Sequence, residues 1–215
     1  MLKHVDIISD PICPWCYIGK KRFEKALKKQ NNHGAITIHW QPFQLNPWIP
    51  ENGIKRKEYL IKKFGSIERY SMVYKEILNA GLNEGINFDF EKIHITPNTT
   101  QAHRLIRWSR PLGIQNQIIE DLFDAFFHKG ENIGDKEILL KIGLKHDAKN
   151  SLTQEFFENN EYRDEVISDF NSAKELGVSG VPFFIINKKY SIFGAKSSET
   201  FLEAFDRLND ITIRK

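Results

Sequence analysis

Apolar residues near the start of the chain follow two different periods, and each change of period marks a new element. Lys3 to Ser9 is a short, mostly apolar run that predicts a buried strand, which Asp10-Pro11 ends. From Trp15 to about Gln30 the spacing is helical, and Pro14 stands where a first helical turn tolerates proline. Ala35 to Trp40 alternates and is rich in β-branched residues. The opening therefore predicts a strand–helix–strand unit.

The middle of the chain shows helical spacing of apolar residues almost throughout, and glycines and prolines divide it into separate segments. The predicted helices are Lys57–Phe64, Ile67–Ala80, Thr99–Leu112, Asn116–His128, Lys136–Gly143, Ser151–Asn159 and Tyr162–Leu176. Strand patterns return at Phe183–Ile186 and Tyr190–Phe193, which predict a hairpin, and a last helix is predicted over Ser198–Leu208.

The predicted strands thus lie at the two ends of the chain, and most of the predicted helices lie between them. The simplest architecture is an α/β domain built from both ends, with an all-helical domain inserted between its second and third strands. We place the α/β domain at residues 1–50 and 177–215, and the inserted helical domain at residues 51–176.

The composition is that of an ordinary globular protein, with 40% hydrophobic and 27% charged residues among 215. A net charge of +3 is too balanced to predict a nucleic-acid or membrane partner. Asp6 and Asp10 interrupt the N-terminal apolar run, so it does not read as a signal-peptide core, and no stretch is apolar enough to span a membrane. We therefore expect a cytoplasmic protein with no nucleic-acid or membrane partner.

Both cysteines of the chain lie in Cys13-Pro14-Trp15-Cys16, at the start of the first predicted helix. Side chains three residues apart share a helix face, within reach of disulfide geometry. The helix N-terminus should stabilise a thiolate at Cys13, whereas Cys16 lies deeper and would be the resolving thiol. In a reducing compartment, this spacing beside a βαβ unit favours redox chemistry.

The cysteine pair also has three simpler interpretations. A structural disulfide that closes so short a loop would restrain little of the unfolded chain. A metal site needs about four ligands, and the chain has neither a second cysteine pair nor histidines close to this one. The third interpretation is a pair of inert thiols.

A second feature is Val181-Pro182, which immediately precedes the predicted strand Phe183–Ile186. A cis peptide bond would be natural there, and the alternative is an ordinary proline at a strand start. If Pro182 faces Cys13, its missing N–H keeps the backbone from ligating a metal. The polar groups of Val181 would then be free to hold an extended peptide.

The segments DPICPWCYIGKKRFEKAL, GVSGVPFFIIN and FGA resemble the thioredoxin-fold DsbA superfamily. The resemblance is strongest to its FrnE-like branch, which is grouped with 2-hydroxychromene-2-carboxylate isomerases. The segments WQPFQLNP, PNTTQAHRLIRWS and FFHKGENIGD also look like motifs of that branch, so the resemblance covers nearly the whole chain. It implies a thioredoxin fold with a helical insertion and thiol–disulfide oxidoreduction. It also implies Cys13 as nucleophile, Cys16 as resolving cysteine and Pro182 as a cis-proline facing them.

Two departures from the family pattern affect the expected chemistry. Pro14-Trp15 replaces the Pro-His of periplasmic DsbA, so the thiolate lacks one cationic partner and the disulfide should be less oxidising. Many thioredoxin-fold enzymes carry a buried acid six residues before the nucleophile, where this chain has Ile7. Asp6 should point to the opposite face of the strand. A water or Asp10 would therefore have to accept the proton of the resolving thiol.

The polar group Asn98, Gln101, His103 and Arg104 clusters at the start of a predicted helix, in a segment that recurs in the resembling branch. Two interpretations stay open for it. The side chains could line a cleft above Cys13, or they could form a helix cap with a solvated arginine.

Two other functions also stay open. Kappa-class glutathione transferases and chromene isomerases of the same superfamily bind glutathione and usually lack the second cysteine, whereas this chain keeps Cys16. A redox-regulated binding module or chaperone is favoured by exposed aromatic residues, which could instead fill a core between domains. These aromatic residues are Trp40, Phe43, Trp48 and Trp108.

We therefore predict a thiol–disulfide oxidoreductase whose substrate is a disulfide or thiol on a protein or a small molecule. The predicted catalytic residues are Cys13 and Cys16. We expect no bound metal or organic cofactor, with glutathione as a candidate redox partner and a homodimer as a candidate assembly. The predicted substrate-binding residues are Pro14, Trp15, Val181 and Pro182.

Overall fold

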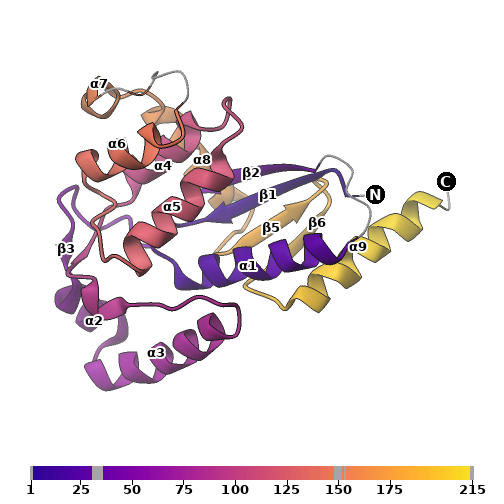
Figure 1. Cartoon of the computed structure of the whole chain (residues 1–215), viewed down its shortest axis with the longest axis horizontal. Helices are drawn as coiled ribbons and strands as arrows, with labels where there is room; N and C mark the ends of the chain where they lie inside the picture. The colour runs from indigo at the N-terminus through magenta and orange to yellow at the C-terminus, as the bar shows by residue number, and fades with distance from the viewer. Residues whose placement is uncertain (1, 31–35, 148–151, 153, 214–215) are drawn as a thin grey trace.

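The main sheet of the protein is assembled from the two ends of the chain (Figure 1). The computed structural model describes residues 2–30, 36–147, 152 and 154–213. Strands β1 and β2 run parallel, and β5 lies antiparallel to both β1 and β6, which gives the order β2-β1-β5-β6. Their bounds are β1 His4–Ser9, β2 Thr37–Pro42, β5 Phe183–Ile186 and β6 Tyr190–Phe193. The predicted first residue of the second strand, Ala35, lies outside the described residues.

Helices α1 (Pro14–Lys29) and α9 (Ser198–Ile213) lie side by side along the sheet (Figure 1). Phe23 of α1 contacts Phe184 of β5 and Phe201 of α9, with ring centroids 5.5 Å apart in both pairs. All three rings are fully buried. Their burial fixes α1 against the sheet, so that its N-terminus follows directly from the end of β1.

The middle of the chain contains the predicted helices, with small shifts of their ends. The helix predicted over Thr99–Leu112 ends at Trp108, because the chain enters a turn there that leads to Gly113 at φ 71°. The predicted start of another helix, Ser151, lies outside the described residues. The observed bounds are α2 Arg56–Phe64, α3 Ile67–Leu82, α4 Thr100–Trp108, α5 Gln115–Phe127, α6 Lys136–Leu144, α7 Gln154–Glu158 and α8 Arg163–Glu175.

The insertion also contains a small sheet that the hydrophobic pattern did not predict. Strands β3 (Ile54–Lys55) and β4 (Ile95–Thr96) pair antiparallel, and a short 3-10 helix, η1 (Phe90–Lys92), precedes β4. Strands of two residues are too short to show alternation of apolar and polar positions. The pattern over residues 51–176 therefore predicted helices alone.

The inserted helices and the sheet share one continuous apolar core. Helices α4, α5 and α8 contact β2, and Tyr17 of α1 stacks on Phe123 of α5 at a centroid distance of 4.7 Å. The domain boundaries at residues 50 and 177 stay a prediction, because this core runs across them. Among the described residues, no helix combines the length and the apolar character needed to cross a bilayer.

Candidate active site

The two cysteines lie at the N-terminus of α1. Cys13 is the N-cap residue, Pro14 is the first helical residue, and the backbone N–H of Cys16 donates to the Cys13 carbonyl oxygen at 3.0 Å. Both thiols are free and buried, with Cys13 4% and Cys16 1% exposed. Cys13 therefore lies at the N-terminus of a sixteen-residue helix, whose partial positive charge stabilises an anion.

The segment before β5 faces this helix end. The Val181–Pro182 peptide bond is cis, as the resemblance to the DsbA superfamily implied, and the Cys13 Sγ lies 3.8 Å from the Val181 carbonyl oxygen. A Cβ added to Gly19, on the second turn of α1, would lie 2.9 Å from Pro182 Cγ. Glycine at this position therefore lets α1 approach the Val181–Pro182 segment closely. Cys13 and Val181, which are 168 residues apart in the chain, are thus neighbours at the Cys13 thiol.

The thiol of Cys16 is held in its protonated form by its surroundings. Burial raises its pKa well above the ordinary value, and the neighbouring Cys13 raises it further. The Ser9 side chain and the backbone N–H of Asp10 offset only part of this effect. Cys16 must therefore lose a proton before it can attack a disulfide.

Asp10 is a fully buried carboxyl group in the loop between β1 and α1. Its Oδ2 accepts the backbone N–H of Leu45 at 2.8 Å, its Oδ1 accepts that of Ile12 at 3.3 Å, and its carbonyl oxygen accepts that of Cys13 at 2.9 Å. Burial raises the pKa of Asp10 to about 6, although the hydrogen bonds from Leu45 and Ile12 oppose the shift. Asp10 therefore shapes the loop that presents Cys13, and its carboxyl group titrates close to neutral pH.

His103 lies beside Asp10, with Nε2 at 3.9 Å from Asp10 Oδ1. This nitrogen donates to the Phe43 carbonyl oxygen at 3.1 Å. Burial lowers the pKa of His103 to about 3, so its ring is neutral at pH 7. The buried acid near the cysteines is therefore accompanied by an uncharged imidazole.

A pocket of about 280 Å³ opens beside Cys13. Three of the predicted substrate-binding residues line it, namely Pro14, Trp15 and Val181, whereas Pro182 is buried and does not. Helices α2 and α3 also line it, and no sequence motif pointed to their side chains. A signal was present in α3, where Tyr70, Val73, Tyr74 and Ile77 recur at helical spacing and mark one apolar face.

Arg104 is neither solvated nor part of this pocket, so both sequence-based interpretations of it were wrong. Its side chain is 1% exposed and donates to the carbonyl oxygens of Glu161 and Phe156 at 2.7 and 2.6 Å. A third N–H donates to Gln101 Oε1 at 2.7 Å. Arg104 therefore links α4 to α7 and to the start of α8.

The aromatic residues that favoured a binding module are mostly packed in the interior. Trp40, Phe43 and Trp108 are buried. Trp48 is 42% exposed, and the ammonium group of Lys62 covers its ring at 3.7 Å from the centroid. The surface argument for a binding module thus reduces to a single tryptophan.

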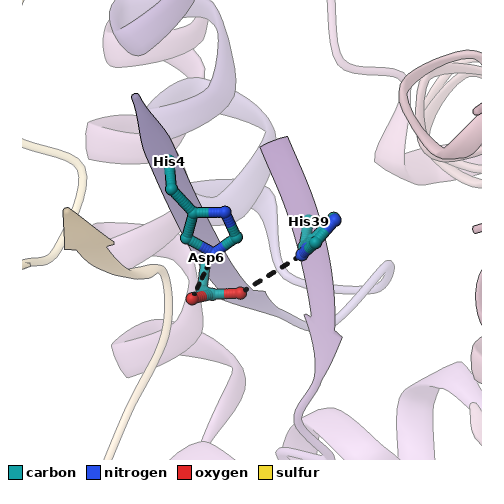
Figure 2. A group of neighbouring side chains, drawn as sticks. All are labelled: His4, Asp6 and His39. Atoms are coloured by element: carbon teal, nitrogen blue, oxygen red, sulfur yellow. Dashed lines mark hydrogen bonds and ion pairs between the residues drawn. The ribbon is translucent and has the colours of Figure 1, made fainter. Parts of the chain in front are cut away.

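Figure 2 shows a cluster on β1 and β2, in which Asp6 lies between His4 and His39. His4 Nε2 is 2.8 Å from Asp6 Oδ2, and His39 Nδ1 is 3.8 Å from Asp6 Oδ1. Two imidazoles and a carboxylate are a ligand set that a divalent transition metal accepts. However, the Arg110 guanidinium already donates to His39 Nδ1 at 2.9 Å, and the Gln41 amide donates to Asp6 Oδ1 at 3.1 Å. The cluster is therefore better described as a hydrogen-bonded link between the two strands.

Comparison with known proteins places this site in a family. A family model described as "DSBA-like thioredoxin domain" matches residues 4–206. The uncharacterized protein YwbO of Bacillus subtilis (strain 168) is 26% identical over 205 residues, which cover 95% of this chain and 96% of that protein.

Two solved structures share the fold. A probable DsbA oxidoreductase from Streptomyces coelicolor superposes with a TM-score of 0.86 at 26% identity, covering 95% of this chain and 88% of that one. A 2-hydroxychromene-2-carboxylate isomerase superposes with a TM-score of 0.70 at 15% identity, covering 98% of each chain. Since the family model spans nearly the whole chain, this protein belongs to the DSBA-like thioredoxin domain family.

Proposed function

We propose that this protein is a thiol–disulfide oxidoreductase that exchanges disulfides through Cys13 and Cys16. The main support is the position of Cys13 at the N-terminus of α1, beside the Val181 carbonyl oxygen and a substrate-sized pocket. We further propose that it acts in the cytoplasm and belongs to the FrnE-like branch. The chain's low cysteine content supports a reducing compartment.

The exchange proceeds in two steps. The Cys13 thiolate attacks one sulfur of a substrate disulfide, so that a Cys13–substrate disulfide forms and the other half leaves as a thiolate. The sulfur of Cys16 then attacks that of Cys13 and releases the second half. The cysteine pair is oxidised by two electrons and the substrate is reduced, and the reverse sequence oxidises a dithiol. Val181 and Trp15 hold the substrate beside the reacting sulfurs.

The second step requires a base, because the raised pKa of Cys16 keeps its sulfur protonated. We propose that Asp10 accepts this proton. Its burial in the loop that contacts Cys13, and a pKa of about 6, support this role. A carboxylate with that pKa is ionised at pH 7 and is a stronger base than an ordinary aspartate.

The first test is the equilibrium of the Cys13–Cys16 pair in glutathione buffers, measured by alkylation of free thiols and mass spectrometry. A potential near that of thioredoxin, about −270 mV, would identify a reductant, and one near −120 mV an oxidant. Cys13→Ser should abolish exchange, and Cys16→Ser should accumulate mixed disulfides. Full activity of Cys16→Ser together with a stable glutathione complex would support the alternative, a glutathione-dependent isomerase or transferase.

A further inference from the structure

The side chains that line the pocket beside Cys13 restrict the class of substrate that it can bind. We infer that it binds a small disulfide with an aromatic body and a carboxylate group, held by Arg56 and Lys63 while Cys13 attacks its sulfur. This inference rests on the proposed function and names the substrate class for it.

The walls of the pocket select for a flat apolar group. Most of its lining is aromatic or aliphatic, and the aromatic side chains include Trp15, Tyr59, Phe64, Tyr70, Tyr74 and Phe90. Rings that line a pocket favour another ring, which stacks on a face or meets an edge. A volume of about 280 Å³ accommodates a small molecule. An extended polypeptide would need a longer groove.

Two cations give the pocket its polarity. Arg56 and Lys63 line it, and no Asp or Glu is found among its described lining residues. Neither cation forms an ion pair with a carboxylate among the described residues. The Arg56 Nη1 donates to Thr96 Oγ1 at 3.3 Å, while its buried Nε has no hydrogen-bond partner among the described residues. An unpartnered guanidinium N–H and an ammonium group in one pocket are complementary to a carboxylate.

Tyr59 places both cations at the same wall. The Arg56 guanidinium lies 5.2 Å from the centroid of this ring, and the Lys63 ammonium lies 5.3 Å from it. Cys13, Gly180 and Val181 line the same pocket from the start of α1 and the segment before β5, and the exposed ring of Phe193 lines it as well. Because the two cations and Cys13 line one pocket, a single small ligand can pair with the cations and present its sulfur to Cys13.

The low exposure of Cys13 also supports a small substrate that binds inside the pocket. Because the residue is only 4% exposed, a substrate must enter the pocket to reach its sulfur. For an aryl disulfide, attack by the Cys13 thiolate forms a Cys13–S–S–aryl bond and releases one aryl thiolate. Cys16 then loses its proton, forms the Cys13–Cys16 disulfide and releases the second aryl thiolate. Two electrons pass from the cysteine pair to the substrate.

Stopped-flow oxidation of the reduced protein by three disulfides tests the inference. The probes are 5,5′-dithiobis(2-nitrobenzoate), which is aromatic and anionic, 4,4′-dithiodipyridine, which is aromatic and neutral, and oxidised glutathione, which is anionic without a ring. Arg56→Gln and Lys63→Gln should each lower the rate of oxidation by the nitrobenzoate disulfide about tenfold, as expected for the loss of a charge-assisted contact. The rate with dithiodipyridine should stay within about twofold.

Lys62→Gln is the matched control, because Lys62 neighbours Lys63 but covers Trp48 and does not line the pocket. An equal effect of Lys62→Gln would show a general charge effect and overturn the inference. Equal slowing of all three probes by Arg56→Gln and Lys63→Gln would also overturn it. If these variants slowed oxidised glutathione alone, the cations would serve a glutathione site and the aromatic assignment would be wrong. Failure of the wild type to react with dithiodipyridine would instead refute the proposed thiol exchange.

Discussion

Asp10 shows how burial changes the chemistry of a single residue. The sequence places it in a loop next to a proline, where an aspartate is usually solvated. In the structure it is fully buried, with backbone hydrogen bonds to both oxygens. Because its pKa is raised to about 6, the carboxyl group binds its proton more tightly in the folded protein than in the unfolded chain.

Asp10→Asn should therefore change how stability depends on pH. The ordinary pKa of aspartate is 3.8, so between about pH 4 and 6 the folded wild type binds more protons than the unfolded chain. The stabilisation that the protonated Asp10 gives to the folded state is fully present below pH 4 and is lost as the pH rises through 6. We measure the free energy of unfolding of both proteins with urea at each pH. The value for Asp10→Asn minus that for the wild type should increase by up to about 3 kcal/mol from pH 4 to pH 6. Parallel curves for the two proteins would contradict the assigned pKa.

The same substitution separates the two steps of exchange. Formation of the mixed disulfide at Cys13 should be nearly unchanged, whereas its resolution by Cys16 should slow, because the proton acceptor is gone. Rapid alkylation after mixing with a substrate disulfide would measure both steps. Equal slowing of both would instead point to a displaced loop, since Asp10 also shapes the backbone at Cys13.

At the scale of elements, the approach of α1 to the Val181–Pro182 segment depends on one small residue. The Cβ of an alanine at Gly19 would lie 2.9 Å from Pro182 Cγ and 3.5 Å from the Cα of Ala195. The first distance is too short for a relaxed contact, so either the helix or the segment must move. The position of Val181 relative to Cys13 would change with it.

Gly19→Ala should accordingly lower both stability and thiol reactivity. Alanine favours a helix by about 1 kcal/mol over glycine, but overpacking typically costs about 1–3 kcal/mol. We expect a net loss of about 1 kcal/mol in the free energy of unfolding and slower reaction of Cys13 with a neutral disulfide. Lys28→Ala, at an exposed position of α1, is the control and should change stability by less than about 0.5 kcal/mol. A stabilised Gly19→Ala would show that the contact is relieved at no cost.

At the scale of the whole molecule, one carboxylate connects α1 to the insertion. Glu120 of α5 accepts hydrogen bonds from Tyr17 at 3.0 Å and Lys21 at 2.6 Å, and it also pairs with the buried ammonium group of Lys20. Burial alone would raise the pKa of Glu120, but the two ammonium groups outweigh it, so the net shift is downward. The ionised form is therefore favoured in the folded protein.

Glu120→Gln should weaken this connection above the ordinary pKa of the carboxyl group. We expect a loss of about 1–2 kcal/mol at pH 7, reduced from the value for a fully buried pair because Glu120 is 34% exposed. As the pH falls through the lowered pKa, Glu120 of the wild type becomes protonated and the two proteins should converge. Urea unfolding at pH 7 and pH 3 measures this. Glu199→Gln, which removes an exposed pair with Lys29, should have little effect at either pH.

The sequence by itself determined the features that depend on local spacing. The helical and alternating periods placed the helices and the four strands of the main sheet, because they report which face of each element is apolar. The spacing of Cys13 and Cys16 at a helix start, and the proline before β5, predicted the cysteine site, because both are local features of the sequence.

Only the tertiary structure decided which side chains meet. Periodicity shows that a face is apolar, but it does not show what covers that face, so the helices opposite Cys13 could not be chosen from the sequence. The pocket joins the start of α1, α2, α3 and the segment before β5. Arg56 and Lys63 reach it from α2, a helix whose side chains no sequence motif connected with the cysteines. Burial of Arg104 and Asp10 likewise follows from residues distant in sequence, because desolvation depends on every element packed around a group and not on its neighbours in the chain.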